Sequence, residues 1–212
     1  MGITERRERE KEQRKNDIVD AAERVFFKKG HENATMDDVA SEAELSKGTL
    51  YLYFKNKEEL YLAIHLRGNR ILHSLFEKAI KNIKTGIEKT RAIGRAYVAF
   101  YKEYPDYFNA MLYFESHDID FDDQDSVANE CLIEGKATLE LLVESIITGI
   151  KDGSIRADID PIKTAINLWG QTTGVLQVAS LKEKIVLMKN FDICAQDVID
   201  YCFDLIYHSL KT

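Results

Sequence analysis

Residues that interrupt helices are scarce in this sequence. Only two of the 212 residues are proline and eleven are glycine. Apolar residues make up 45% of the chain and charged residues 31%, which excludes a disordered or fibrous protein and is typical of a globular, helix-rich one. The length suits one medium domain or a small domain joined to a larger one.

Cysteine is sparse as well. The three cysteines, Cys131, Cys194 and Cys202, are an odd number, lie far apart and have no CxxC pair or paired histidines near them. This pattern excludes a disulfide framework or a zinc site. We interpret all three as small buried hydrophobic residues, and we expect no metal and no cofactor.

Long apolar runs and catalytic motifs are absent too. The opening MGITERRERE lacks the apolar segment of a secretory signal, and no apolar stretch is long enough to span a bilayer. We therefore expect a cytoplasmic protein with no membrane partner. The sequence has no nucleophile elbow, no HExxH and no glycine-rich phosphate loop after a strand, so we do not expect an enzyme.

Positive charge is in deficit, since the formal net charge is −7. This balance argues against a protein that binds nucleic acid with its whole surface, so any contact with DNA must be a local patch. One candidate patch is residues 1–15, where four glutamates are interspersed with Arg6, Arg7, Arg9, Lys11, Arg14 and Lys15. Two interpretations stay open for this segment: a solvated helix start, or an arm that contacts DNA.

What is abundant is helical periodicity, which predicts an all-α fold of about nine helices. The first helix carries one apolar stripe (Ile18, Ala21, Ala22, Val25, Phe26) and ends at Gly30. We expect a three-helix helix-turn-helix domain over residues 12–65. A larger helical domain should follow over residues 66–212, joined to the first by a long fourth helix. Its further helices are predicted at 88–104, 106–115, 127–152, 161–182 and 194–210, with Pro105 and Pro161 opening two of them.

Two short helices in the first domain are joined by a tight turn. Thr35 is the predicted cap of a helix with an apolar stripe from Met36 to Ala43. Two residues later Ser46 caps a second helix, Lys47 to Phe54, which should bury Leu50 and Phe54 and turn its small and hydrogen-bonding residues outward. Two short helices braced by a preceding one are the geometry of a helix-turn-helix.

Specific positions in this second helix and in the helix that follows it favour contact with DNA. Gly48, near its amino end, lets the backbone approach base edges closely. Lys57 lies in the first turn of the fourth helix, where a cation is unfavourable for the helix dipole. A phosphate group bound by Lys57 would explain its place there.

The stretch from Thr35 to Leu60 resembles the DNA-binding signature of the TetR family of bacterial and archaeal regulators; it reads TMDDVASEAELSKGTLYLYFKNKEEL. The resemblance covers about residues 14–62 and includes IVDAAERVFFKKG in the first helix. It implies base or nearby backbone contacts by Lys47, Gly48, Thr49 and Tyr51, and phosphate contacts by Thr35, Tyr53 and Lys57. The alternatives are that Thr35 is only a cap, that Tyr53 packs on the first helix, and that Lys57 is merely solvated.

The larger domain carries two apolar stripes near its carboxyl end. One includes Ile162, Ile166, Trp169 and Leu176, with Gly170 and Gly174 one turn apart, and the other runs from Val198 to Ile206. The resemblance implies that the last two helices of each subunit form a homodimer, which would read a palindromic operator in double-stranded DNA. The alternative is that both stripes belong to the core of a single chain.

Aromatic residues are concentrated in the middle of the chain. So many tyrosines are more plausible around a mixed cavity than in a dry core, and the resemblance implies an effector pocket in this domain. We expect a small apolar or aromatic effector, lined by Tyr97, Tyr101, Tyr104, Phe108, Met111 and Trp169. The alternative is that these aromatic residues are core.

Two further features are candidate metal sites. Residues 116–126 hold five aspartates but lack the central glycine and closing glutamate of a calcium loop, which favours a solvated connection. His65 and His73 lack carboxylate support and are interpreted as surface or core side chains.

Together these features predict a sequence-specific DNA-binding transcriptional regulator, a repressor released from its operator by the effector. One rival is a DNA-binding protein without an effector, controlled by a protein partner or acting in chromosome organisation. The other is a helical carrier that no longer binds DNA.

Overall fold

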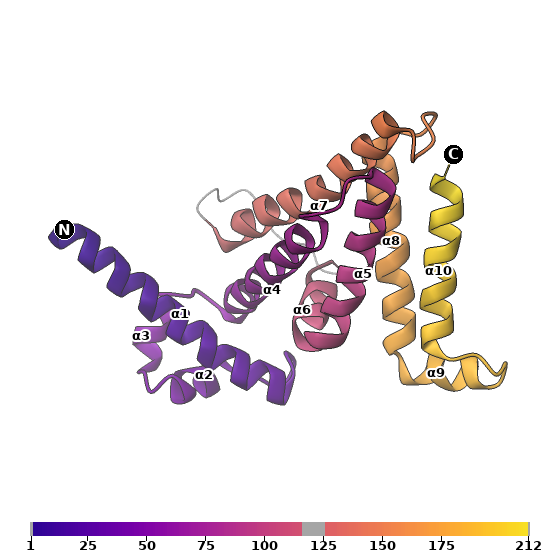
Figure 1. Ribbon diagram of the computed structural model, residues 1–212. Coiled ribbons are helices and arrows are strands. Elements are labelled where there is room, and N and C mark those ends of the chain that lie inside the picture. The colour runs from indigo at the N-terminus through magenta and orange to yellow at the C-terminus, as the bar shows by residue number, and fades with distance from the viewer. Residues whose placement is uncertain (1, 116–125, 212) are drawn as a thin grey trace. The chain divides into compact units, whose positions relative to one another are not determined.

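The computed structural model describes residues 2–115 and 126–211, and within them the chain forms ten helices and no strand (Figure 1). The all-α prediction is confirmed. The helices are α1 (Ile3–Lys29), α2 (Met36–Glu42), α3 (Lys47–Tyr51), α4 (Lys57–Ile80), α5 (Gly86–Glu103), α6 (Pro105–Glu115), α7 (Val127–Asp152), α8 (Pro161–Ser180), α9 (Lys182–Lys189) and α10 (Ala195–Leu210). The aspartate-rich loop lies outside the described residues, apart from its last residue, Ser126. No described helix is both long and apolar enough to cross a bilayer.

The clearest differences from the prediction are the start of α1, the end of α3 and one additional helix, α9. Helix α1 begins at Ile3, so the charged opening segment is helical. Helix α3 stops at Tyr51, although Tyr53 and Phe54 still hydrogen-bond to the Leu50 carbonyl. Helix α9 was not predicted, because Leu181 interrupts the helical run with extended backbone (φ −79°, ψ 119°) without a glycine or proline to signal it.

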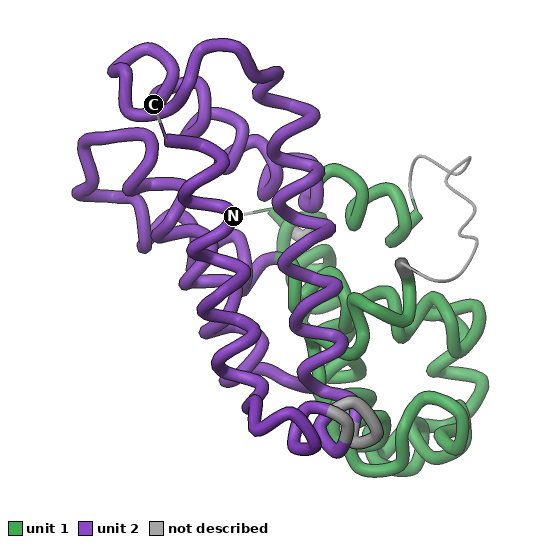
Figure 2. Tube along the Cα trace, turned by 90° about the vertical axis from the view of Figure 1, so that its right-hand side faces the viewer, with its two compact units in different colours: residues 1–69, 106–133 green, residues 70–105, 134–212 purple. Residues whose placement is uncertain are grey.

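The chain packs as two compact units, drawn in green and purple in Figure 2. Unit 1 comprises residues 1–69 and 106–133, and unit 2 comprises residues 70–105 and 134–212. Unit 1 therefore adds α6 and the first turns of α7 to the helix-turn-helix. The sequence predicts two consecutive domains that meet near residue 65, and this division stays a prediction.

The core of unit 1 is built on the stripe that the sequence predicts. Ile18 and Ala22 of α1 are fully buried, as are Val39 of α2 and Leu50 of α3. Phe54, just after α3, is buried completely as well. Burying these side chains fixes the helix-turn-helix, because each fully buried large apolar side chain contributes about 1.5–3 kcal/mol.

Helix α6 is fastened to the helix-turn-helix by a polar network. The Tyr107 hydroxyl donates to Glu23 Oε1 at 2.8 Å. Arg67 Nη1 lies 2.6 Å from Asp20 Oδ1 and 2.9 Å from Glu23 Oε2, which ties α4 to α1. Burial raises the pKa of Glu23 although Tyr107 and Arg67 both act to lower it. Three helices of unit 1 thus share one hydrogen-bonded junction.

Unit 2 relies on close backbone packing. A Cβ on Gly86 would overlap the backbone of Gly149, so α5 and α7 approach each other closely at this point. Asp152 accepts a hydrogen bond from the Gly86 N–H at 2.8 Å. Helix α10 packs against α8 and α5. The predicted start of α8 is confirmed, since Asp160 caps it and Pro161 is its first residue.

One expectation about cysteine was wrong. Cys131 is buried and donates to the Leu62 carbonyl, but Cys202 is only partly buried and Cys194 is exposed. Cys194 precedes the first residue of α10, and this position at a helix end leaves its side chain open to solvent.

Candidate nucleic-acid interface

Helix α2 begins with a complete capping box. The Thr35 hydroxyl accepts a hydrogen bond from the Asp38 N–H at 3.2 Å and donates to Asp38 Oδ2 at 2.9 Å. Hydrogen bonds from Lys29 and from Thr35 lower the pKa of the Asp38 carboxyl. Thr35 is exposed but its hydroxyl is used as a cap, which is the alternative role that the sequence left open for it.

The turn between α2 and α3 is held by backbone geometry and a second cap. Glu44 takes a positive φ of 55°, and the Leu45 N–H donates to the Ala40 carbonyl at 2.9 Å. Ser46 Oγ then accepts from the Thr49 N–H at 3.1 Å and lies 2.7 Å from Thr49 Oγ1. These contacts set the angle between the two helices and hold the half-buried Thr49 at the start of α3.

The outer face of α3 is open. Lys47, Gly48 and Tyr51 are exposed, and the nearest atom to a Cβ built on Gly48 is Ser46 Oγ at 3.9 Å. A flat surface such as a base edge can therefore come close to the backbone at this point. The amino end of α3 lacks any acidic side chain in its first turn.

Lys47 is held in an ion pair at the edge of this face. Its Nζ lies 2.8 Å from Asp37 Oδ1, and the hydrogen bond with Asp37 raises the pKa of Lys47. Both side chains are more than half exposed, so exchanging Asp37 for a phosphate costs little.

Tyr53 and Lys57, the two predicted phosphate ligands beyond α3, are partly buried. Tyr53 packs against the core of unit 1. Lys57 Nζ donates to the His31 carbonyl at 2.9 Å, which links the start of α4 to the end of α1. Both residues therefore have a structural role in addition to any contact with DNA.

Sequence reasoning missed Leu52. This leucine caps the carboxyl end of α3 and is 80% exposed, beside Tyr51 at 43%. The signal was present, because Leu52 lies two residues from the buried Leu50 and so points to the opposite side of the helix. An apolar side chain on a recognition helix suits the methyl group of thymine.

The residues predicted to line an effector pocket are divided between the two units. Phe108 and Met111 belong to unit 1 and are buried. Tyr97 of unit 2 is buried, with its hydroxyl 2.9 Å from Thr173 Oγ1, and Tyr101 and Tyr104 are half-buried. Trp169 is 40% exposed on α8.

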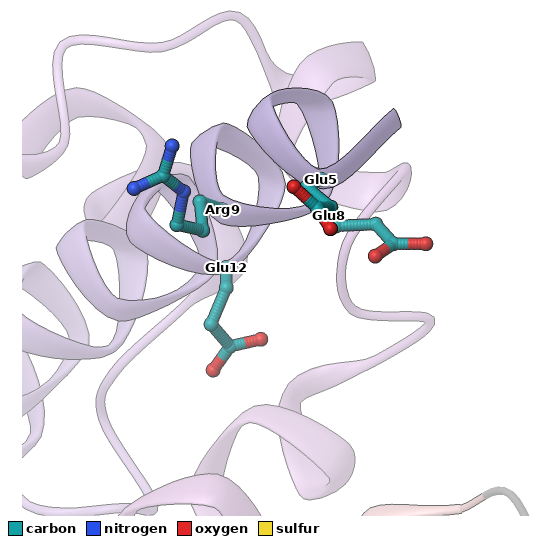
Figure 3. A pocket seen from close by; sticks show the side chains of 4 residues that line it. All are labelled: Glu5, Glu8, Arg9 and Glu12. Atoms are coloured by element: carbon teal, nitrogen blue, oxygen red, sulfur yellow. The ribbon is translucent and has the colours of Figure 1, made fainter. Parts of the chain in front are cut away.

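A surface hollow beside α1 is lined by charged residues alone. Four charged side chains surround it, Glu5, Glu8, Arg9 and Glu12 (Figure 3). Three carboxylates in such a small space repel an acidic ligand and do not suit an apolar one. This hollow is therefore not the predicted effector pocket.

Comparison with known proteins finds a family match for the segment that contains α2 and α3. Residues 18–64 match the family model described as bacterial regulatory proteins, tetR family. This part of the chain thus matches the amino-terminal, DNA-binding part of the TetR family. The matched segment contains the end of α1, all of α2 and α3 and the start of α4. It therefore includes the open outer face of α3.

Named transcriptional regulators are similar to this chain over part of its length. The HTH-type transcriptional activator FasR of Mycolicibacterium smegmatis is 33% identical over 90 residues, which are 42% of this chain and 41% of FasR. The chain thus spans about two fifths of that relative's length. The HTH-type transcriptional repressor KstR2 of Rhodococcus jostii is 28% identical over 151 residues, 69% of this chain and 70% of KstR2.

A solved structure of a transcriptional regulator shares the fold over most of the chain. The transcriptional regulator FadR from Bacillus subtilis, in complex with stearoyl-CoA, superposes with a TM-score of 0.69 at 18% identity, over 91% of this chain and 97% of FadR. The all-helical fold behind the helix-turn-helix is therefore shared with FadR.

Proposed function

We propose that this protein is a TetR-type transcriptional regulator that binds double-stranded DNA by placing α3 in the major groove. The observation that carries the proposal is the match of residues 18–64 to the family model, combined with an exposed α3 whose amino end is bare at Gly48. The relatives described above are named as regulators and not as enzymes. A regulatory rather than catalytic role follows for this chain.

In the proposed complex the two sides of α3 have different tasks. Lys47, Gly48, Thr49 and Tyr51 approach the bases, and Leu52 contacts a thymine methyl group. Thr35, Tyr53 and Lys57 bind phosphates, which position the protein without selecting sequence. The exposure of Lys47, Tyr51 and Leu52 supports the first set.

The proposed assembly is a homodimer through α8 and α10. Ile162, Ile166 and Trp169 share one face of α8 and are 40–59% exposed. On α10, Tyr201 and Leu205 are 65% and 54% exposed, on the side away from the buried Ile199 and Ile206. Gly170 and Gly174 have no atom within 4 Å of a built Cβ, so a partner helix can approach α8 closely.

The proposed effector is a small apolar or aromatic molecule that releases the protein from its operator. The stearoyl-CoA bound to FadR makes a fatty acyl thioester the first compound to test. Relatives include both an activator and a repressor, and we propose repression for this chain. The rival is a regulator without a small-molecule effector, for which acyl thioesters change neither DNA affinity nor thermal stability.

The experiment that tests the proposed function is in vitro selection of bound sequences from random DNA with the purified protein. A palindromic consensus is expected. Salt-sensitive binding without any consensus would favour chromosome organisation instead, and no binding at low salt would favour the helical carrier.

A matched selection tests the base contact of Lys47. The Lys47→Ala variant should return a consensus that is relaxed at one position of each half-site, since one base contact is worth about 1–3 kcal/mol of discrimination. Return of the original consensus would remove Lys47 from the base-reading set. Asp37→Asn, which frees Lys47 from its ion pair, is the control and should keep the consensus.

A further inference from the structure

Helix α1 extends well beyond the core that it helps to build. It runs for 27 residues, yet its first fully buried residue is Ile18. Among residues 4–17 only Lys15 is even half-buried. This segment, the α1 arm, is about 21 Å long. In Figure 1 it continues the indigo helix past α2 and α3 to the N-terminus.

Charge on the α1 arm is sorted by side. At about 100° per residue, Arg7, Lys11 and Arg14 fall within about 60° of one another, in line with the buried Ile18. These three residues form the basic stripe. Glu5, Glu8 and Glu12 lie about a third of a turn away, around the hollow in Figure 3.

A contact inside unit 1 shows which way the basic stripe faces. Lys15 Nζ lies 5.9 Å from the centre of the Phe54 ring, just beyond the carboxyl end of α3. Lys15 is one turn from Lys11 on the same side of α1. The basic stripe therefore starts at the edge of the helix-turn-helix and leads away from it along the arm.

Several acidic residues of the arm have partners within it, whereas the residues of the basic stripe do not. Glu5 accepts a hydrogen bond from the Gly2 N–H at 3.0 Å, and Glu10 pairs with Arg6 at 2.7 Å. Within residues 2–115 and 126–211, no ion pair or hydrogen bond involves Arg7, Lys11 or Arg14, and all three are exposed. Three cations on one side of a helix are left for an external anion.

We propose that the α1 arm is a second DNA-binding element, in which the basic stripe binds the phosphates that flank the half-site read by α3. This inference rests on the proposed function. The arm continues the helix on which α2 packs, so DNA docked on α3 lies within its reach. The stripe spans about 10 Å, which matches about three phosphate steps at about 3.4 Å per strand step. A protein of net charge −7 needs such local attraction.

The test compares two double variants that remove equal charge from the arm. Lys11→Gln with Arg14→Gln removes two cations from the basic stripe, and Arg6→Gln with Arg9→Gln removes two from other sides of the helix. Glutamine keeps the helix propensity, and circular dichroism checks that both variants fold. The probes are the duplex recovered by in vitro selection and the same duplex with about six more base pairs at each end.

On the long duplex, the stripe variant should lose nearly one unit of salt slope for each phosphate contact removed, while the control keeps the wild-type slope. On the short duplex the wild type and both variants should bind alike. Equal losses of salt slope in the two variants, or no loss in either, would overturn the DNA-binding role of the arm and leave the proposed function intact. A selection that returns no bound duplex for the wild type would overturn both.

Discussion

Lys57 has two uses for one ammonium group. In the free protein it donates to the His31 carbonyl, and in the proposed complex it also binds a phosphate. We predict that Lys57→Ala weakens binding to every DNA sequence and lowers the salt slope by about one for each chain. Fluorescence anisotropy over a salt series measures both quantities. An unchanged slope would leave Lys57 with its structural role alone.

His65 is the residue whose ionisation is coupled most clearly to folding. Its Nδ1 is buried without a hydrogen-bond partner and its ring packs on Phe114, so burial lowers its pKa to about 4. A lowered pKa means that the neutral ring is favoured in the folded state. Its contribution to stability is therefore complete above the ordinary pKa of about 6.5 and is lost as the pH falls towards 4.

We predict that the free energy of unfolding of the wild type falls by up to about 3 kcal/mol between pH 6.5 and 4 because of this group. His65→Gln should flatten that part of the pH profile, as urea titrations at several pH values would show. His208→Gln, at an exposed position of α10, is the control and should keep the wild-type profile. Equal slopes in His65→Gln and wild type would contradict the assignment.

At the scale of the helices, α6 is the element with the most specific attachment. Burial raises the pKa of Tyr107, and its hydrogen bond to Glu23 raises it further, so the hydroxyl stays a donor at all physiological pH values. Tyr107→Phe removes that donor and leaves Glu23 with one partner fewer. We predict a loss of roughly 1–2 kcal/mol in the free energy of unfolding, measured by urea denaturation.

A control variant distinguishes the effect of losing this hydrogen bond from the effect of losing a tyrosine hydroxyl in general. Tyr201→Phe changes a residue that is 65% exposed, and it should leave the stability within about 0.5 kcal/mol of the wild type. If both variants behave alike, the hydrogen bond between Tyr107 and Glu23 does not stabilise the attachment of α6.

The sequence predicted the helices and their caps better than the contacts between distant helices. The apolar spacing from Ile18 to Phe26, the caps Thr35 and Ser46 and the opening proline Pro161 are local signals, and the structure has them in place. Contacts between distant segments leave no local signal. The packing of α6 on α1 through Tyr107 and Glu23, 84 residues apart, is one example, and the bond from Lys57 to the His31 carbonyl is another.

At the scale of the whole molecule, the proposed dimer depends on the exposed faces of α8 and α10. Ile166→Glu places a charge in the middle of the α8 face, where burial without a partner costs roughly 3 kcal/mol or more. We predict a folded monomer with weakened operator binding, which sedimentation and anisotropy would detect. Ile133→Glu on α7, where the wild-type side chain is 62% exposed, should stay dimeric. If Ile166→Glu stays dimeric, the dimer interface does not include the α8 face.

The central claim is that a homodimer binds a palindromic operator. Its most direct test is the mass of the complex with the selected duplex, measured by analytical ultracentrifugation. The account predicts two chains on each duplex, with half-sites about 34–36 Å apart, one helical turn. A single chain per duplex, or a mass that grows with the length of the DNA, would contradict it.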